Sequence, residues 1–559
     1  LDLFGHCLVP SRACYLYFFG RESPFIPSFP TNTPRIHCRT MNGHAASKVS
    51  LSHEEGMGLL DEKTLSDVES ESGRVDLESR FAIPRWSTVA RGAVGYFRAI
   101  PWRVTVIRGL IFLLPSFVQS RFTRERGRTE KLFPTSHLDG MRGLAALFVF
   151  FCHYFYQAFI IAEGWGSSEK NYHVLKMPFL RLFYQGPPAV CLFFVISGYA
   201  LSMKPIKLAR ARNFDEFSTT TTSLIFRRFI RLYLPTAIST FGIMMLLQLG
   251  VYEWTRDFAI DKTYHKNVME PHPKPLDTFS EQLTDWMWSM FNFVHVFGWE
   301  KFGGSTSYDV HLWTIPVEFR CSMYLFITLI GLARVRTGLR FLFLWGIIVF
   351  TYRNNRWELL LFYFGMMLAE YDQIMGNNTL VGGSVLPTNE TQPNRNRFKG
   401  FCWAMLSILS IYFMCQPDIN YEITPGWVWL CSFIPKWWDA EGYRFWQSIG
   451  AVIFVLCVSH SPRWKSFFNL APIQYLGKIS YALYLMHGPV MHTIGYMIER
   501  RAYAITGIEG WWYNTGFVLG SMGCIPAVIW AADVFWRLFD VPTVRFAKWL
   551  ETNCSIKQE

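Results

Sequence analysis

The chain has 559 residues, of which 51% are hydrophobic, 17% are aromatic and only 17% are charged. This composition is too apolar for a soluble protein of this length, and the charged residues fall between long apolar runs, as is typical of a polytopic helical membrane protein. The formal net charge of +12 does not indicate nucleic-acid binding, because the basic residues cluster in short segments beside apolar runs, where the positive-inside rule places them.

The cysteines give no sign of a disulfide framework or a metal site. Most of the twelve cysteines lie within apolar runs, and the sequence contains neither a CxxC pair nor an HExxH motif. We therefore expect no bound metal.

The N-terminal region differs in composition from the rest of the chain. Residues 1–40 lack the pattern of a signal peptide, and we expect none there. Acidic and polar residues dominate 47–80, so residues 1–85 are predicted to form a disordered acidic cytosolic tail. Residues 86–132 mix arginines with tryptophan and aliphatic residues, which suits an interfacial segment better than a membrane span.

The apolar runs predict an all-α membrane domain with about ten transmembrane helices over residues 133–545, followed by a short C-terminal tail, 546–559. The expected spans are 138–161, 188–203, 230–251, 311–333, 338–351, 357–371, 401–415, 445–460, 473–497 and 512–539.

The basic residues also predict the topology. They concentrate before the first span, between spans 2 and 3, and between spans 4 and 5, which places these segments and both termini in the cytosol. The long stretch 252–309 then lies on the opposite side. Residues 377–396 form a cytosolic linker, so we expect its glycosylation-type triplets at Asn377 and Asn389 to be unmodified.

The first predicted span carries three ionisable residues, Asp139, Arg142 and His153. Eleven residues of helix bring His153 back to within roughly 20° of Arg142 and about 16 Å further along the axis. Charged groups are costly at membrane depth and usually face a protein interior. A snorkelling arginine and a hydrogen-bonded packing histidine would account for the pattern equally well.

Two further motifs stand at the second and third spans. Ser197 and Gly198 interrupt an apolar run, where small residues allow close helix packing. Arg227, Arg228 and Arg231 are spaced to share one face of a helix, and such a face suits phosphate groups. Positive-inside anchoring explains this cluster as well.

The last two motifs combine polar groups with expected burial. Thr314 and Glu318 lie one turn apart in the fourth span, and a lone carboxylate at membrane depth is more often functional than structural. Ser480, Tyr484 and His487 recur at helical spacing. A hydrogen-bonded packing stripe would look the same.

Together these groups make acyl transfer from an anionic, phosphate-bearing donor chemically sensible. Histidine is a natural base for a hydroxyl nucleophile near neutral pH, a carboxylate can orient it, and arginines can hold phosphates. Composition alone leaves a proton-coupled transporter open, although no inverted repeat supports that alternative.

The ordered set of motifs at 138–153, 193–199, 227–235, 311–319 and 479–489 resembles the acyltransferase 3 family, and most closely its fungal members, over about 133–545. The resemblance implies an acyl-CoA donor, His153 as the catalytic base and coenzyme-side roles for Arg142, Arg227, Arg228 and Arg231. Glu318 matches the acidic position of the family's Trp-Ser-Leu-x-x-Glu motif, and Thr314 stands where many members have serine.

The sequence thus predicts a multi-pass acyltransferase of an endomembrane or the plasma membrane. We expect it to esterify a hydroxyl of a small metabolite, lipid or glycan, with acetyl-CoA or another acyl-CoA as co-substrate, and to bind neither metal nor nucleic acid. The expected catalytic residues are His153 and Glu318. The expected supporting residues are Asp139, Ser197, Trp313, Thr314, Tyr484 and His487.

Overall fold

The computed structural model describes residues 102–122, 132–169, 171–294, 304–376, 393–438 and 441–555. These residues all belong to one unit within 54–559. The predicted N-terminal tail, most of the predicted linker 377–396 and both glycosylation-type asparagines lie outside the described residues.

The described residues form helices, together with a single isolated β-bridge between Glu163 and Ile419 and no strand. The α-helices are α3 Trp102–Leu113, α4 Ser116–Phe122, α5 Ser136–Ala158, α6 Gly186–Arg210, α7 Phe214–Gln248, α8 Arg256–Ala259, α9 Phe279–Phe293, α10 Thr314–Leu332, α11 Thr337–Arg353, α12 Trp357–Met375, α13 Pro393–Met414, α14 Val428–Cys431, α15 Arg444–His460, α16 Pro462–Phe468, α17 Ala471–Val490, α18 Tyr496–Thr506, α19 Gly510–Phe535 and α20 Val541–Cys554. Short 3-10 or π turns are η1 Val174–Lys176, η2 Arg181–Tyr184, η3 Val251–Trp254, η4 Val310–Trp313, η5 Met491–Gly495 and η6 Trp536–Asp540.

Each predicted apolar run coincides with a helix, which confirms the all-α prediction for the described residues. By length and composition, four of these helical segments could cross a membrane: Gly186–Arg210, Phe214–Gln248, Val310–Leu332 and Gly510–Cys554. A fifth is added if α15 and α16, bent by 97°, count as one span. The predicted number of about ten is therefore not confirmed, because the other helices are shorter or less apolar. Helix α11, for example, has only 17 residues.

The structure adds a helix to the C-terminal segment. Residues 541–554, most of the expected tail among them, form helix α20, which packs against α7. This contact brings the end of the chain next to the arginines at the start of the third predicted span.

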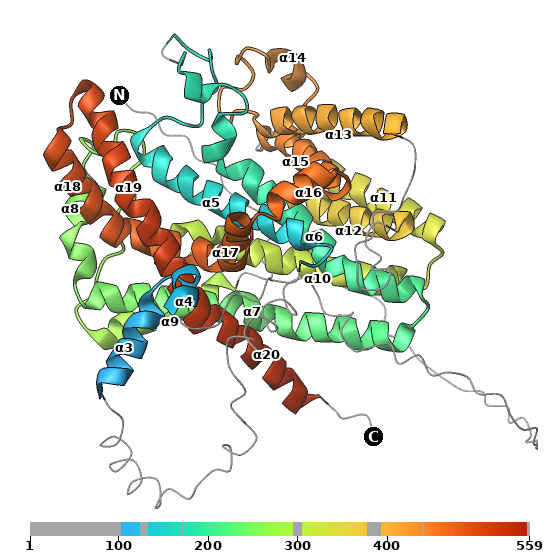
Figure 1. Ribbon diagram of the computed structural model, residues 1–559, viewed down its shortest axis with the longest axis horizontal. Helices are drawn as coiled ribbons and strands as arrows, with labels where there is room; N and C mark the ends of the chain where they lie inside the picture. Colours follow the sequence, from blue (N-terminus) through green and yellow to red (C-terminus); the bar gives the residue numbers. More distant parts are fainter. Residues whose placement is uncertain are drawn as a thin grey trace, which may run out of the picture. The chain divides into compact units, whose positions relative to one another are not determined.

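Helices α5, α6 and α17 lie between the α18–α19 pair and the α11–α12 pair (Figure 1). Glycines allow the closest approaches. A Cβ atom on Gly143 of α5 would lie 2.2 Å from the backbone nitrogen of Gly477 in α17, and one on Gly198 of α6 would lie 2.2 Å from the carbonyl oxygen of Phe362 in α12. Small residues let apolar helices pack closely, so the packing interpretation of Gly198 is confirmed.

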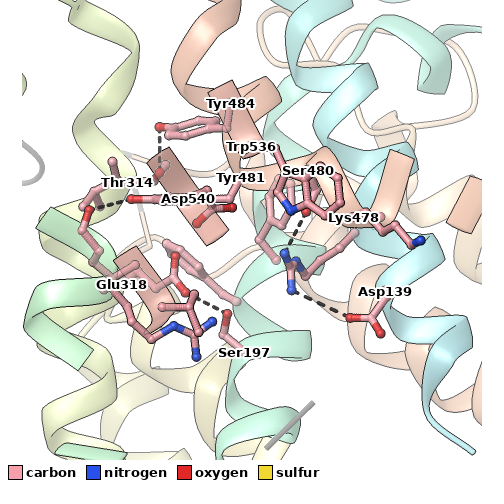
Figure 2. Close-up of a pocket in the computed structure, with 18 of the residues that line it drawn as sticks. Asp139, Ser197, Thr314, Glu318, Lys478, Ser480, Tyr481, Tyr484, Trp536 and Asp540 are labelled. Atoms are coloured by element: carbon pink, nitrogen blue, oxygen red, sulfur yellow. Dashed lines mark hydrogen bonds and ion pairs between the residues drawn. The ribbon is translucent and has the colours of Figure 1, made fainter. Parts of the chain in front are cut away.

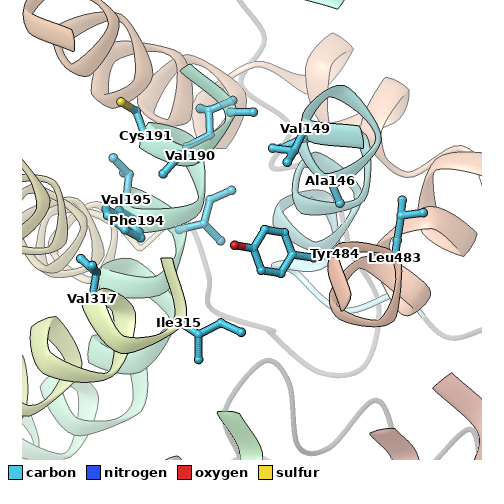
Figure 3. Close-up of a cluster of buried hydrophobic side chains, with 14 of the residues drawn as sticks. Ala146, Val149, Val190, Cys191, Phe194, Val195, Ile315, Val317, Leu483 and Tyr484 are labelled. Atoms are coloured by element: carbon cyan, nitrogen blue, oxygen red, sulfur yellow. The ribbon is translucent and has the colours of Figure 1, made fainter. Parts of the chain in front are cut away.

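Buried apolar side chains from α5, α6, α10 and α17 form the centre of the bundle (Figure 3). Val149, Phe194, Ile315 and Leu483 are each at most 3% exposed. Tyr484 reaches from α17 into this cluster. Close packing of this kind holds side chains in fixed rotamers. It also fixes the four helices relative to one another, and with them the backbone positions of the polar residues that they carry.

Candidate active site

A cavity of about 150 Å³ opens between α5, α6, α7, α10, α17 and the segment η6–α20 (Figure 2). Pockets for drug-sized ligands are typically about 300–1,000 Å³, so this cavity suits a slender part of a ligand. Its polar lining residues are Asp139, Arg142, Ser197, Arg228, Arg231, Thr314, Glu318, Lys478, Ser480, Tyr481, Tyr484 and Asp540.

Arg142 lines the cavity from α5. Its Nη2 atom donates a 2.7 Å hydrogen bond to the Ser480 hydroxyl on α17, and its Nη1 atom lies 3.9 Å from the Asp139 carboxylate one turn earlier. The close approach at Gly143 makes this reach across to α17 possible. Three of the predicted residues, Asp139, Arg142 and Ser480, therefore form one group at the cavity wall.

Arg228 and Glu318 form a largely buried ion pair that joins α7 to α10. Arg228 Nη2 lies 2.7 Å from Glu318 Oε1, and Arg228 Nε donates to the Ser322 hydroxyl at 3.0 Å. The Ser197 hydroxyl donates to the same Glu318 oxygen at 3.0 Å. Two predicted motifs thus meet at a single carboxylate, and the Ser197 hydroxyl has a hydrogen-bonding role.

The arginine cluster of α7 is divided by the fold. Arg228 and Arg231 line the cavity. Arg227 is turned toward α20 instead, where its Nε atom lies 3.0 Å from the Glu551 carboxylate, and it also donates to the Ser223 hydroxyl at 2.9 Å. Successive residues of a helix point about 100° apart, so the packing of α20 separates Arg227 from its two neighbours.

Thr314 and Tyr484 meet in the lining of the cavity. The Thr314 hydroxyl donates a 2.7 Å hydrogen bond to the Tyr484 hydroxyl, which in turn donates to the backbone carbonyl of His311. The predicted supporting residue Trp313 does not contribute to the described cavity lining. The Arg444 guanidinium carbon lies over the Trp313 ring, 5.5 Å from the ring centroid.

Beyond Tyr484 lies a cluster of histidines. The His153 ring is centred 4.2 Å from that of His311 and 5.3 Å from that of His487, and His487 is 5.8 Å from Tyr484. His487 Nδ1 is 3.3 Å from the Leu483 carbonyl, while His487 Nε2 and His153 Nδ1 are buried and have no hydrogen-bond partner among the described residues. Two ring nitrogens are thus left to take part in chemistry.

Four residues of this region have no role in the sequence prediction. His311 Nδ1 is 2.7 Å from Asp309 Oδ1, and His311 Nε2 is 3.1 Å from Glu270 Oε1. The second Glu270 oxygen is 2.8 Å from His492 Nε2. Asp309 and His311, two positions apart at the edge of a predicted motif, are a usable signal in the sequence. Glu270 and His492 are distant in sequence, and no motif marks them.

Glu270 is fixed in its ionised form by these neighbours. Burial by itself would raise the pKa of the Glu270 carboxyl, but charge and hydrogen bonds from His311 and His492 hold that pKa well below its usual range. A third hydrogen bond comes from Gln157 Nε2 at 2.9 Å. A stable carboxylate therefore lies within the histidine cluster.

A cavity lined by paired arginines and carboxylates, near buried histidines and inside a bundle of apolar helices, gives this membrane-type protein a candidate active site. Comparison with known families gives the particular class. Residues 136–533 match the family model described as an acyltransferase domain. This range covers most of the chain, and the chain belongs to the acyltransferase 3 family.

Characterised fungal proteins are similar over most of their length. The O-acetyltransferase PaAT-1 of Phomopsis amygdali is 33% identical over 78% of this chain and 87% of its own. The acyltransferase R4 of a Phoma species is 25% identical over 76% and 97%, and the acyltransferase clz18 of Cochliobolus lunatus is 24% identical over 76% and 97%. No solved structure matches. The resemblance drawn from the motifs is confirmed.

Proposed function

We propose that this protein is an O-acetyltransferase that moves the acetyl group of acetyl-CoA to a hydroxyl of a small metabolite, lipid or glycan. Family membership establishes an acyltransferase, and the similarity to an O-acetyltransferase supports oxygen as the acceptor atom and acetyl as the group transferred. The observation that carries the donor assignment is the cavity itself, which has arginines on its walls and ends at Tyr484 beside the histidines.

In this proposal Arg142, Arg228 and Arg231 bind the phosphates of coenzyme A. All three line the cavity, and guanidinium groups bind phosphate oxygens through paired N–H donors. The slender cavity suits the extended pantetheine arm, with the thioester at the Tyr484 end. Arg227 lies away from the cavity, in contact with Glu551, and therefore serves as a test of this assignment.

His153 acts as the general base. Its unpartnered Nδ1 atom takes the proton of the acceptor hydroxyl as the hydroxyl oxygen attacks the thioester carbonyl carbon. The carbon–sulfur bond then breaks, and the coenzyme A thiolate leaves and receives the proton from His153. The products are the acetyl ester and free coenzyme A.

Glu318 and His487 are positioning residues in this scheme. Glu318 contacts Arg228 and Ser197, so it holds the arginine in place for the donor. His487 stacks on His153 with ring planes 26° apart, and it limits the movement of the catalytic ring. Asp139 similarly accompanies Arg142.

The test is acetyl transfer by purified full-length protein. The wild type or His153→Ala is mixed with radiolabelled acetyl-CoA and with fractions of a fungal extract as the source of the acceptor. Labelled product and free coenzyme A are then measured for each protein. We expect equimolar product and coenzyme A from the wild type alone. The comparisons give no support to a transporter, and proton-gradient-dependent uptake into proteoliposomes without acetyl transfer would overturn the proposal.

We further propose that all ten predicted runs lie within the membrane and that both termini are cytosolic, with residues 133–545 as the catalytic domain. The basic segments that flank the first, third and fifth runs support this orientation. Single introduced cysteines in the segments 261–278 and 204–213 test it. A membrane-impermeant thiol reagent added to intact vesicles of known orientation should label one position of the two, and labelling of both from one side would contradict the topology.

A further inference from the structure

Three residues from separate segments converge on one point behind the histidine cluster. Glu270 comes from the stretch between α8 and α9, His311 from η4 and His492 from the π turn η5. They are 8%, 3% and 8% exposed, and their nearest ligand atoms all lie within 4.8 Å of one another. Two imidazole nitrogens and a carboxylate at this spacing form a donor set that metal ions bind.

Outer contacts orient each of these groups. Asp309 Oδ1 accepts from both the backbone nitrogen of His311 and its Nδ1 atom, at 2.9 and 2.7 Å, which turns His311 Nε2 toward Glu270. Gln157 donates to Glu270 at 2.9 Å. Histidines that bind metals typically donate their other ring nitrogen to a carboxylate, which fixes the ring and its tautomer. The Asp309–His311 pair has this arrangement.

The backbone at His492 is also unusual. Residues 491–495 form a π turn that interrupts the helical register between α17 and α18. Such turns are rare and occur frequently at functional sites. The His492 carbonyl is held by the Thr255 hydroxyl at 2.7 Å, so the turn is fixed with its imidazole directed at Glu270.

The charges of this region match a divalent cation. Glu270 and Asp309 are two buried carboxylates, and their ion-pair partners among the described residues are His311 and His492. A divalent ion beside these two carboxylates matches their charge, and histidine binds metal ions through a ring nitrogen that carries no proton.

We propose that Glu270, His311 and His492 bind a divalent transition-metal ion. Two imidazoles and one carboxylate are a common ligand set for Zn²⁺, and three protein ligands leave one position of a tetrahedral ion open. A water molecule takes that position. The ion joins the segment 261–278 to η4 and to the α17–α18 junction and fixes the wall of the histidine cluster.

The metal content of the full-length protein tests this proposal directly. Protein purified in detergent without chelators is exposed to Zn²⁺ or Co²⁺, passed through a desalting column and analysed by mass spectrometry of the metal. We expect a close to equimolar ratio for Zn²⁺ and, for Co²⁺, the intense visible absorption of a tetrahedral complex. A metal-free protein, or the weak spectrum of octahedral Co²⁺, overturns the site.

Single substitutions test which residues bind the metal ion. Glu270→Gln and His492→Ala should each weaken Zn²⁺ binding at least tenfold in competition with a coloured chelator, whereas the exposed His173→Ala should bind as the wild type does. Gel filtration reports whether each variant is folded, and the Co²⁺ spectrum of the wild type decides the outcome if a variant aggregates. Equal Zn²⁺ affinity in all four proteins refutes the assignment.

This test is independent of the proposed acetyl transfer. Metal content and spectrum require neither acetyl-CoA nor an acceptor. A metal-free protein that still transfers acetyl groups would remove the metal site and leave the proposed function intact. A metal-loaded protein that transfers no acetyl groups would keep the metal site and remove the proposed function.

Discussion

The replacement Arg228→Gln, together with a double variant that removes its ion-pair partner, tests donor binding apart from structural support. Arg228 is only 6% exposed and uses two of its N–H groups for Glu318 and Ser322. An arginine has five N–H donors, so others can reach a phosphate in the cavity. Glutamine keeps a polar side chain, although a shorter one, and removes the charge.

The expected loss of affinity follows from the bond that is removed. A charge-assisted hydrogen bond contributes about 1.5–3 kcal/mol, which corresponds to a roughly 10–150-fold weaker Kd for acetyl-CoA at about 1.4 kcal/mol per tenfold change. Arg228→Lys should recover part of this affinity, because lysine keeps the charge and loses the fork. The assay is equilibrium binding of acetyl-CoA to purified protein, which needs no acceptor.

A stability effect accompanies the same change and has its own control. Removing one partner of a buried ion pair costs about 3–5 kcal/mol, and we expect less here because the Glu318 side chain is 22% exposed. In the double variant Arg228→Gln/Glu318→Gln no unpaired charge remains. The double variant should therefore regain Tm while its affinity for acetyl-CoA stays low.

The neighbouring arginine supplies the matched comparison. Arg227 has the same charge and is similarly buried, but it contacts Glu551 rather than the cavity. Arg227→Gln should leave the affinity for acetyl-CoA unchanged. If Arg227→Gln weakens binding and Arg228→Gln does not, the cavity is not the donor site and the proposed orientation of the active site is wrong.

Four other expectations can be checked with the same material. His153→Ala should lower acetyl transfer by about 10²–10⁴-fold with an unchanged gel-filtration profile, and full activity would remove its role as the base. Tyr484→Phe should lower the free energy of unfolding by about 1–3 kcal/mol, because a buried hydroxyl and a carbonyl lose their partner; an unchanged denaturation midpoint would contradict this. Gly143→Val would force a Cβ atom to within 2.2 Å of the α17 backbone, and it should abolish accumulation of folded protein, whereas normal expression would show that α5 and α17 can separate. Removal of residues 1–85, which lie outside the family match, should leave specific activity unchanged, and a large loss would show that they contribute to catalysis.

The sequence by itself determined the helices and the family. The spacing of apolar residues and the order of the motifs can be read without knowledge of the fold. Each predicted run became a helix, and the motifs were sufficient to predict the family before any fold was known. Arg142, Glu318 and Ser480 are polar groups within apolar runs, and all three line the cavity. Burial in an apolar bundle requires such groups to find partners, so their positions in the sequence carried the signal.

The number of spans was less well determined. Hydropathy marks where a helix is apolar, but whether that helix faces lipid or protein depends on its neighbours. Buried Glu358 and Glu370 in α12 show that a helix can carry charge when other helices cover it. The apolar runs therefore predicted helices more reliably than membrane crossings.

Only the tertiary structure decided which polar groups meet. Helical periodicity placed Arg227 and Arg228 in one cluster, and the packing of α20 then drew Arg227 to Glu551 and left Arg228 in the cavity. Glu270 and His492 are 222 positions apart in the chain and 2.8 Å apart in space. A local pattern fixes the face on which a residue lies, whereas a contact between distant segments depends on how the whole bundle packs, and no local spacing records it.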